Sequence, residues 1–346
     1  MTIAIRRVAL QRERALLIDF LAKYLTPYSN DRRFDWLYLE NPIGQARVWL
    51  AEDTGTGAML GTSAVFPRRF YVRGKETLGF VLGDFCIHPG FRSLGPAIQL
   101  QKACIHEMES SIRTMGYDFP SERMLAVHRR LGVWPGDRLI RLAKPLKMDR
   151  KVAEKVRMPL VARSLSRLGN QLLRWRDQRR KLSRTEQIGW HTGSCGEEFS
   201  TLAVSVSADH EVCLARTADY LNWRYVAHPF QKFEILTARR DGALDAYLIL
   251  NQEGEDARIV DLFGKEYPGL LSGIVAHAVE LLRRRGVVTL SAPVLASHRW
   301  VHLFESLGFV KRESTPVITY PATGVFSDDQ DGHEAKWFLM DGDRDS

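Results

Sequence analysis

Asp84-Phe-Cys-Ile-His-Pro-Gly-Phe-Arg-Ser-Leu-Gly-Pro-Ala97 is the stretch that decides the fold, because it predicts a buried strand, a tight turn and the start of a helix. The turn contains the pattern Arg-x-x-Gly-x-Ala, at Arg92, Gly95 and Ala97. Small residues there let an anion approach the backbone, where the first helical N–H groups and the helix dipole favour negative charge. Pro96 suits the first turn of a helix, although it removes one N–H donor. The pattern therefore predicts a phosphate-binding turn, and the alternative for the motif taken alone is an ordinary turn between a strand and a helix.

The residues on either side of this turn predict alternating strands and helices. The stretch before it is mostly apolar, as in a strand covered on both faces, and the stretch after it has apolar residues at close to helical spacing. Gly132 stands where the glycine that follows a helix belongs. The expected elements are a strand at 80–87, helical spacing over 98–115, a strand at 116–119, a helix at 122–131 and a strand at 138–142.

This order of elements, with its Arg-x-x-Gly-x-Ala turn, resembles the core of the GCN5-related N-acetyltransferases over about residues 84–132. The resemblance implies an α/β (α+β) fold with a mixed, mostly antiparallel sheet flanked by helices. It also implies that the turn holds the pyrophosphate of acyl-coenzyme A and that the preceding strand carries the pantetheine arm. The implied cofactor-binding residues are Cys86 and Ile87 on the strand, Arg92, Ser93, Leu94, Gly95 and Ala97 in the cradle, and Ser121 in place of the family's Asn.

The resemblance also implies two catalytic candidates. Acyl transfer to an amine needs a neutral nucleophile, a polarised carbonyl and a proton for the leaving thiolate. Asp84 stands on the strand that often carries the base, and His128 stands where the family often has a proton-donating Tyr. Alternatively, Asp84 is bonded to backbone or to an arginine, and His128 is a histidine on the helix surface. Trp36, Tyr38 and Trp49 are either part of an acceptor cleft or part of the core.

An internal repeat predicts that the domain is duplicated. Trp36-x-Tyr-x-x-x-Pro recurs as Trp223-x-Tyr-x-x-x-Pro, and Asp84-Phe and Leu131-Gly are matched in the same order by Asp261-Leu and Leu307-Gly. Three ordered matches favour two tandem acyl-CoA N-acyltransferase-like domains over chance. The second copy lacks the Arg-x-x-Gly-x-Ala turn and has Phe304 at the place that matches His128. We expect it not to bind acyl-CoA, and the alternative is binding through a different turn.

Length and composition fit two soluble domains. At 346 residues and 45% hydrophobic residues, we expect a first domain at 1–150, a basic helical connector at 151–190 and a degenerate second domain at 191–346. No apolar run approaches the length of a membrane-spanning helix, and the N-terminus lacks the apolar core of a signal peptide. The four cysteines show neither metal-type spacing nor a disulfide framework. These features predict a cytoplasmic protein with free thiols and no metal site.

The connector holds the whole net charge of +8, because eleven Lys and Arg face three acids between Lys151 and Trp190. Its apolar residues recur at steps of four and three and predict one face of a helix, which we call the apolar stripe: Val161, Leu165, Leu168, Leu172 and Trp175. The other face carries Arg163, Arg167, Arg174 and Arg176. We expect the stripe to pack on the domains. Contact with anionic lipid or with RNA phosphates are the alternatives.

Together these patterns predict an N-acyltransferase that uses acetyl-CoA and an amine acceptor. The layout resembles envelope-polysaccharide proteins of this superfamily, which suggests an amino sugar or sugar nucleotide as acceptor. The alternatives are a non-catalytic coenzyme A sensor or scaffold, and an aminoacyl-tRNA-dependent transferase of the Fem type, which the chain resembles in architecture only. Outside the connector the charge is balanced, so DNA is not expected as a partner. A last strand is predicted at 337–340, followed by a solvated acidic end with Asp341, Asp343 and Asp345.

Overall fold

The computed structural model describes residues 2–91, 94–109, 115–150, 152, 159–178, 187–320 and 335–344. The strands are β1 (Ile3–Arg7), β2 (Arg47–Asp53), β3 (Met59–Val72), β4 (Lys75–Ile87), β5 (Met115–Asp118), β6 (Asp137–Pro145), β7 (Gln187–His191), β8 (Val212–Leu214), β9 (Phe233–Arg240), β10 (Ala243–Glu253), β11 (Asp256–Gly264), β12 (Thr289–Leu295), β13 (Val310–Tyr320) and β14 (Trp337–Phe338). The helices are α1 (Arg14–Tyr24), α2 (Asp31–Phe34), α3 (Leu94–Glu109), α4 (Glu122–Arg130), α6 (Pro159–Gln178), α7 (Glu197–Ser207), α8 (Ala218–Leu221), α9 (Leu270–Arg284) and α10 (Trp300–Ser306). Short helical turns are η1 (Asp35–Leu39), η2 (Pro89–Phe91), η3 (Asn222–Val226) and η4 (Asp341–Asp343).

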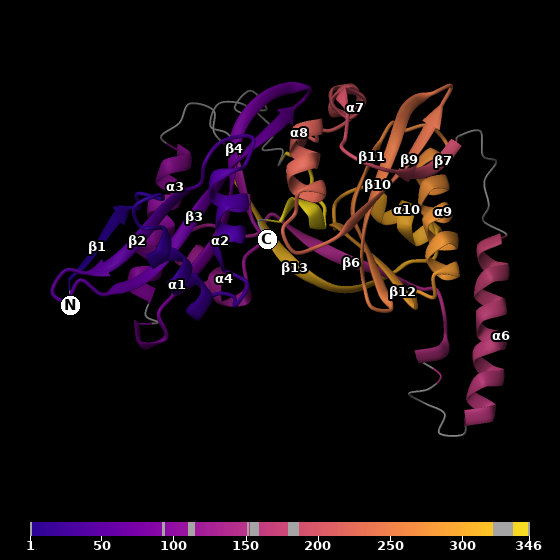
Figure 1. Ribbon diagram of the computed structural model, residues 1–346, viewed down its shortest axis with the longest axis horizontal. Coiled ribbons are helices and arrows are strands. Elements are labelled where there is room, and N and C mark those ends of the chain that lie inside the picture. Colours follow the sequence, from indigo (N-terminus) through magenta and orange to yellow (C-terminus); the bar gives the residue numbers. More distant parts are fainter. Residues whose placement is uncertain are drawn as a thin grey trace.

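These strands form one mixed, mostly antiparallel sheet that runs through both halves of the molecule (Figure 1). Its order is β1-β2-β3-β4-β5-β13-β6-β12-β11-β10-β9-β7, with β8 and β14 attached beside β3. The parallel pairs are β4 with β5, β11 with β12, and β8 with β14. The predicted fold class is therefore confirmed.

Helices cover both faces of the sheet in the first half, and its strands bury apolar residues on both sides. Along β2, Val48 and Leu50 pack in the same core cluster as residues of α1, whereas Trp49 and Ala51 pack with residues of α3. Successive strand residues point to opposite faces, so a strand covered on both sides needs apolar residues at every position. This explains why the sequence there does not alternate. It also places Trp49 in the core.

The two halves exchange strands where they meet. β6 lies in the segment assigned to the first domain, yet it pairs with β12 and β13 of the second half. The end of β13 in turn pairs with β5, from Ile318 opposite Asp118 to Tyr320 opposite Gly116. The sheet is thus continuous across residue 150, and the domain limits at 150 and 190 stay a prediction.

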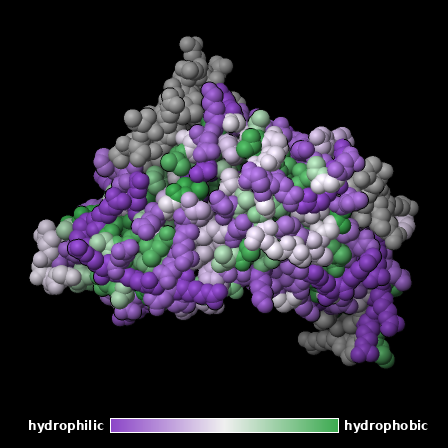
Figure 2. Space-filling model, turned by 45° about the horizontal axis from the view of Figure 1, so that its top comes forward, coloured by the Kyte–Doolittle hydropathy of each residue, from purple (hydrophilic) through white to green (hydrophobic). Residues whose placement is uncertain are grey.

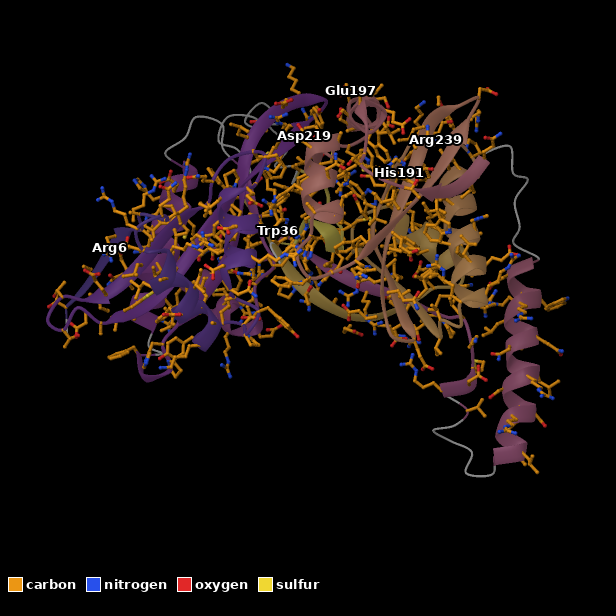
Figure 3. The ribbon with its side chains drawn as sticks, viewed as in Figure 1. Arg6, Trp36, His191, Glu197, Asp219 and Arg239 are labelled. Atoms are coloured by element: carbon orange, nitrogen blue, oxygen red, sulfur yellow. The ribbon has the colours of Figure 1, made fainter. Side chains whose placement is uncertain are left out.

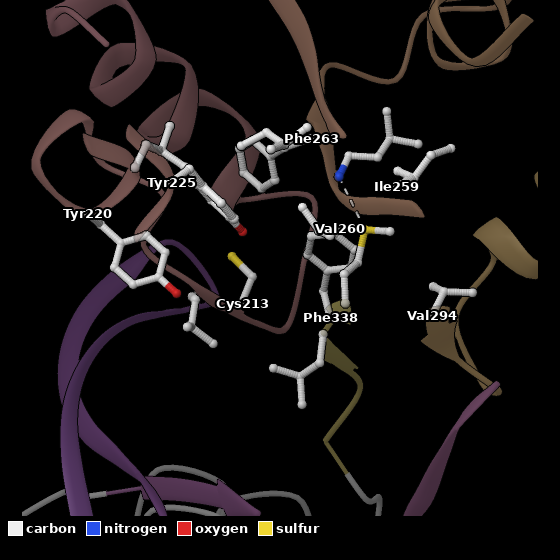
Figure 4. Close-up of a cluster of buried hydrophobic side chains, with 14 of the residues drawn as sticks. Cys213, Tyr220, Tyr225, Ile259, Val260, Phe263, Val294 and Phe338 are labelled. Carbon is white, nitrogen blue, oxygen red and sulfur yellow. Dashed lines mark hydrogen bonds between the residues drawn. The ribbon is translucent and has the colours of Figure 1, made fainter. Parts of the chain in front are cut away.

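The acidic C-terminal end is not solvated, so that expectation is wrong. Asp343 is buried, and both of its carboxylate oxygens accept hydrogen bonds from Arg216. Arg216 is itself fully buried and also binds Asp261. Phe338 enters the same core beside Val260 and Phe263 (Figure 4). Two carboxylates around one buried guanidinium fasten the end of the chain, because a buried charge must be paired. Asp345 lies outside the described residues.

The connector helix is confirmed as a helix, but its predicted packing is wrong. α6 lies at the edge of the molecule, next to α9 (Figure 1), and its apolar stripe is exposed to solvent. Among the described residues, no helix is long and apolar enough to cross a membrane. All four cysteines are free and buried.

Candidate functional site

The site is organised by an irregularity in β4 at Asp84. The pairing of β3 with β4 shifts between Ala64 opposite Gly83 and Thr62 opposite Cys86, so one strand has an extra residue there. Asp84 takes a φ of 44°, in the left-handed region that non-glycine residues rarely adopt. A β-bulge of this kind bends the strand and re-aims its side chains. The bulge therefore lies within the stretch that the sequence singles out.

Beyond this point, among the residues that the structure describes, β4 has no partner strand on the side of β5. The parallel pairing covers only Gly79–Val81 with Met115–Tyr117, and the strands are not paired further along. Gly79 permits their close approach, because a Cβ there would overlap the carbonyl oxygen of Met115. The open edge of β4 leaves backbone hydrogen-bonding groups available to a ligand lying along it.

A cavity of about 310 Å³, which we call the slot, lies at this open edge. It is lined by Phe85, Cys86 and Ile87 of β4, Ala97 of α3, Ser121, Arg123, Met124 and Val127 at α4, and Tyr24 and Leu25 at the end of α1. Four of the eight predicted cofactor-binding residues thus line one cavity. The Ser121 hydroxyl caps α4 by accepting a hydrogen bond from the Met124 N–H at 3.3 Å. Burial raises the pKa of the Cys86 thiol well above its ordinary range, so the thiol stays protonated.

The start of α3 meets the slot through Ala97. Helix α3 begins at Leu94, and Gly95 is exposed in its first turn. The backbone N–H groups of a helical first turn have no partners within the helix and favour an anion. Arg92 and Ser93 lie outside the described residues, as does the side chain of Leu94, so the full cradle stays a prediction.

Asp84 itself belongs to a buried polar cluster. Its carboxylate accepts hydrogen bonds from both terminal nitrogens of Arg33, at 2.6 and 2.7 Å, and a third from the Tyr38 hydroxyl. Burial, followed by the charge of Asp84, raises the pKa of Tyr38 well above its ordinary value. The Tyr38 hydroxyl therefore stays protonated and donates. The structure therefore pairs Asp84 with an arginine, and its catalytic role stays a prediction.

A second cavity of about 610 Å³, the acceptor cavity, reaches Asp84 and Arg33. Its lining comes from both halves: Leu25, Thr26, Tyr28, Arg33, Trp36 and Asp84 from the first, and His228, Phe230, Gln231 and Glu253 from the second. Trp36 lies where the halves meet (Figure 3). Burial, together with Arg224 and Arg33, lowers the pKa of His228 to about 4, so its imidazole is neutral near pH 7.

The acceptor cavity continues over the second half of the sheet. A cavity of about 340 Å³ shares Gln231 and Glu253 with the acceptor cavity. A further cavity of about 600 Å³ shares Arg141, Arg258 and Glu313 with the 340 Å³ cavity. These three cavities adjoin one another through shared residues, many of them on β6, β10 and β11, and we call them together the trough. Its far end has five basic residues against three acids, namely Arg141, Lys147, Arg150, Arg258 and Arg312 against Glu253, Asp256 and Glu313.

The structure does not bring His128 to either the slot or the acceptor cavity. His128 is fully buried on the inner face of α4 and is not on the helix surface. Its Nε2 lies 2.8 Å from the Asp118 carboxylate, and its Nδ1 lies 3.1 Å from the Tyr320 hydroxyl. Its catalytic role stays a prediction. Arg33 and Tyr24 are site residues that the sequence patterns did not predict. Arg33 stands only three residues before Trp36 of the repeated motif.

No protein-family model and no curated protein matches this chain. Solved structures do match. A GCN5-related N-acetyltransferase from Anabaena variabilis has a TM-score of 0.64 at 13% identity, with 91% of this chain and 72% of that chain covered. The N-myristoyltransferase of Saccharomyces cerevisiae, solved with bound myristoyl-CoA, has a TM-score of 0.56 at 11% identity, with 92% and 83% covered. The chain has the N-acyltransferase fold.

A third match extends this result to another bacterial chain. A conserved protein of unknown function from Enterococcus faecalis has a TM-score of 0.64 at 10% identity, with 92% of this chain and 72% of that chain covered. At such identities the likeness concerns the N-acyltransferase fold alone. It spans nearly all of this chain, so both halves of the continuous sheet belong to the shared fold.

Proposed function

We propose that the protein transfers an acyl group from acyl-CoA, with acetyl-CoA as the cosubstrate, to an amine. The observation that carries this proposal is the arrangement around the β4 bulge, with the slot on one side and the acceptor cavity on the other. An extended pantetheine arm would lie along the open edge of β4 at Cys86 and Ile87. The first turn of α3 would hold the pyrophosphate, and the exposed Arg123 at the slot would add a positive charge.

In the proposed reaction, the amine nitrogen attacks the thioester carbonyl, a C–N bond forms and the C–S bond breaks. The nitrogen loses one proton and the leaving thiolate gains one. Asp84 is the proposed group on the amine side, because it lines the acceptor cavity. For the thiolate we propose Tyr24 over the buried His128, because Tyr24 is the one phenol among the residues that line the slot.

The shape and charge of the trough support an acceptor larger than a simple amine. Tyr28 and Phe230 have ring centroids 6.3 Å apart at the acceptor cavity, where the C–H face of a sugar ring or a flat nucleotide base would contact them. Arg141, Arg150 and Arg258 at the far end of the trough are already paired with Glu313, Asp256 and Asp341. Lys147 and Arg312 at the same end would suit phosphate groups, because basic side chains pair well with phosphate oxygens. We therefore propose an amino sugar or sugar nucleotide as the acceptor.

We also propose that the two halves are copies and that the second is silent. Asn30 and Thr217 cap α2 and α8 through their side chains, and each of these helices continues into a π-helical turn. The indole N–H of Trp36 donates to the carbonyl of Trp223, and that of Trp223 donates to Trp36, at 2.9 and 2.8 Å. Such reciprocity is typical of a twofold relation between like units.

In the second half, the place that matches the slot is filled by the chain itself. β11 and β12 are parallel and paired over only three residues, as β4 and β5 are. Met340 pairs with Val294 of β12, and its sulfur accepts the N–H of Leu262 of β11 at 3.3 Å. The C-terminal segment thus lies between the diverging strands (Figure 4). A pantetheine arm would have to displace it, which supports a second copy without coenzyme A.

The test is release of free coenzyme A thiol from acetyl-CoA in the presence of amino sugars, their nucleotide derivatives and simple amines. We expect turnover with at least one amino sugar derivative. The Gly95→Asp variant should bind acetyl-CoA at least about tenfold more weakly, because its carboxylate would stand beside the pyrophosphate. Its thermal stability should be unchanged, because Gly95 is exposed. If the parent bound acetyl-CoA without turnover, a coenzyme A sensor would be favoured. If Gly95→Asp bound acetyl-CoA as tightly as the parent, the pyrophosphate would not bind at the first turn of α3.

A further inference from the structure

Helix α6 is held to the body of the protein by one polar face. Asn170 accepts a hydrogen bond from the Met148 N–H at 2.7 Å and donates to Asp149 at 3.1 Å. Asp177 accepts hydrogen bonds from both Lys144 and Arg283, each at 2.7 Å. Gly169 lets the helix come close, because a Cβ there would lie 2.9 Å from Met148. These contacts fix the rotation of α6 about its own axis.

With that rotation fixed, the apolar stripe points away from the body. The exposed fractions are 42% for Val161, 45% for Leu165, 64% for Leu168, 62% for Leu172 and 49% for Trp175. α6 projects at the lower right of Figure 2, and in Figure 3 many of its side chains point away from the body of the protein. Turning the stripe onto the body would break the hydrogen bonds of Asn170 and both ion pairs of Asp177. Val161, Leu165, Leu168 and Leu172 thus form a row of apolar side chains exposed to water, which favours contact with a partner.

The charge of α6 selects among partners. The helix carries four arginines and one acid, and this acid, Asp177, is already paired with Lys144 and Arg283. The side chains of Arg163, Arg167 and Arg174 are exposed. A second copy of α6 would bring the same positive charges against these, which disfavours self-association. RNA would pair with the arginines and leave the apolar stripe in water. An anionic bilayer satisfies both faces at once, because acyl chains accept the stripe and headgroups attract the arginines.

We propose that α6 is a membrane-surface helix that places the protein on an anionic lipid bilayer. Its 20 residues make a rod about 30 Å long that would lie in the plane of the interface. The leucines and Trp175 would enter the boundary between headgroups and acyl chains, where Trp is favoured. The inference does not depend on the proposed enzymatic activity.

The test is co-sedimentation of the full chain with vesicles of phosphatidylcholine, with and without about 30% phosphatidylglycerol. We expect binding to the anionic vesicles, weaker binding at high salt and little binding to the neutral ones. Leu168→Asp should weaken binding by about tenfold or more, because it places a charge in the apolar stripe. Its melting temperature should match that of the parent, because the Leu168 side chain is 64% exposed. Val204→Asp, at an exposed apolar position of α7, is the matched control and should bind like the parent.

Three results would overturn the proposal. One is equal affinity of the parent and Leu168→Asp for anionic vesicles. Another is a dimer of the parent in sedimentation equilibrium that Leu168→Asp dissociates, because a second copy would then cover the stripe. The third is tight binding to RNA, lost on changing Arg163, Arg167 and Arg174 to Glu, in a protein that ignores vesicles.

Discussion

The buried ion pair between Arg33 and Asp84 gives the sharpest prediction about the site. The two side chains are only 8% and 3% exposed, and two short hydrogen bonds join them. Replacing Arg33 by Met keeps most of the apolar stem but leaves the Asp84 carboxylate without its counter-charge. Breaking a buried pair from one side costs about 3–5 kcal/mol. This is a large part of the total stability of about 5–15 kcal/mol that is usual for a protein.

A double-mutant cycle separates the pair from its surroundings. Arg33→Met, Asp84→Asn and the double variant are unfolded in urea, and the free energies are compared with that of the parent. We expect the double variant to be more stable than Arg33→Met alone, because no unpaired carboxylate remains. The control cycle uses Arg141 and Glu313, a cross-strand pair with side chains 34% and 66% exposed, which should be coupled by less than about 1 kcal/mol. If the coupling energy between Arg33 and Asp84 were no larger than that of the control pair, the two side chains would not form a buried ion pair. The acceptor cavity would then be lined differently.

Two further outcomes test the second half of the molecule. Calorimetry with acetyl-CoA should give one site per chain, because the C-terminal segment occupies the second place between diverging strands; two sites would contradict the silent copy. Burial lowers the pKa of His210 to about 3. Below about pH 6.5 the imidazole therefore binds a proton in the unfolded state but stays neutral in the folded state, and the free energy of unfolding falls as the pH falls. Between pH 7 and pH 5 the parent should lose about 2 kcal/mol more than His210→Phe in urea unfolding, and an equal loss would place His210 in water.

Local chemistry explains how much of the site the sequence could predict. The strand, turn and helix around residues 84–97 depend on neighbours in the chain, and the structure has β4 and α3 there. The bulge at Asp84 and the divergence of β4 from β5 depend on how many residues each neighbouring strand contributes. Arg33 reaches Asp84 from 51 residues away, and His228 comes from the other half. A local sequence pattern does not predict such contacts between residues that are distant in the chain.

For His128, however, a usable signal was present in the sequence. The buried residues of α4 are Met124, Leu125, Val127 and His128. Residues four apart on a helix share a face, so His128 lies on the same side as Met124, toward the core. Its place before a helix-ending glycine suggested a catalytic role by resemblance alone. The helical period, applied to the same nine residues, predicts a buried histidine with polar partners, as the structure has with Asp118 and Tyr320.

Helix α6 shows why a correct pattern can still give the wrong packing. Hydrophobic spacing defines the apolar face of a helix, and that face usually contacts the core. In α6 the face against the body is held by Asn170 and Asp177 instead, because their hydrogen bonds and ion pairs have partners on Met148, Asp149, Lys144 and Arg283. Such polar contacts are directional, whereas burial of the stripe is not, so they decide the rotation of the helix. The two faces of α6 therefore have different roles. The polar face with Asn170 and Asp177 attaches the helix to the protein, and the apolar stripe is left for a partner.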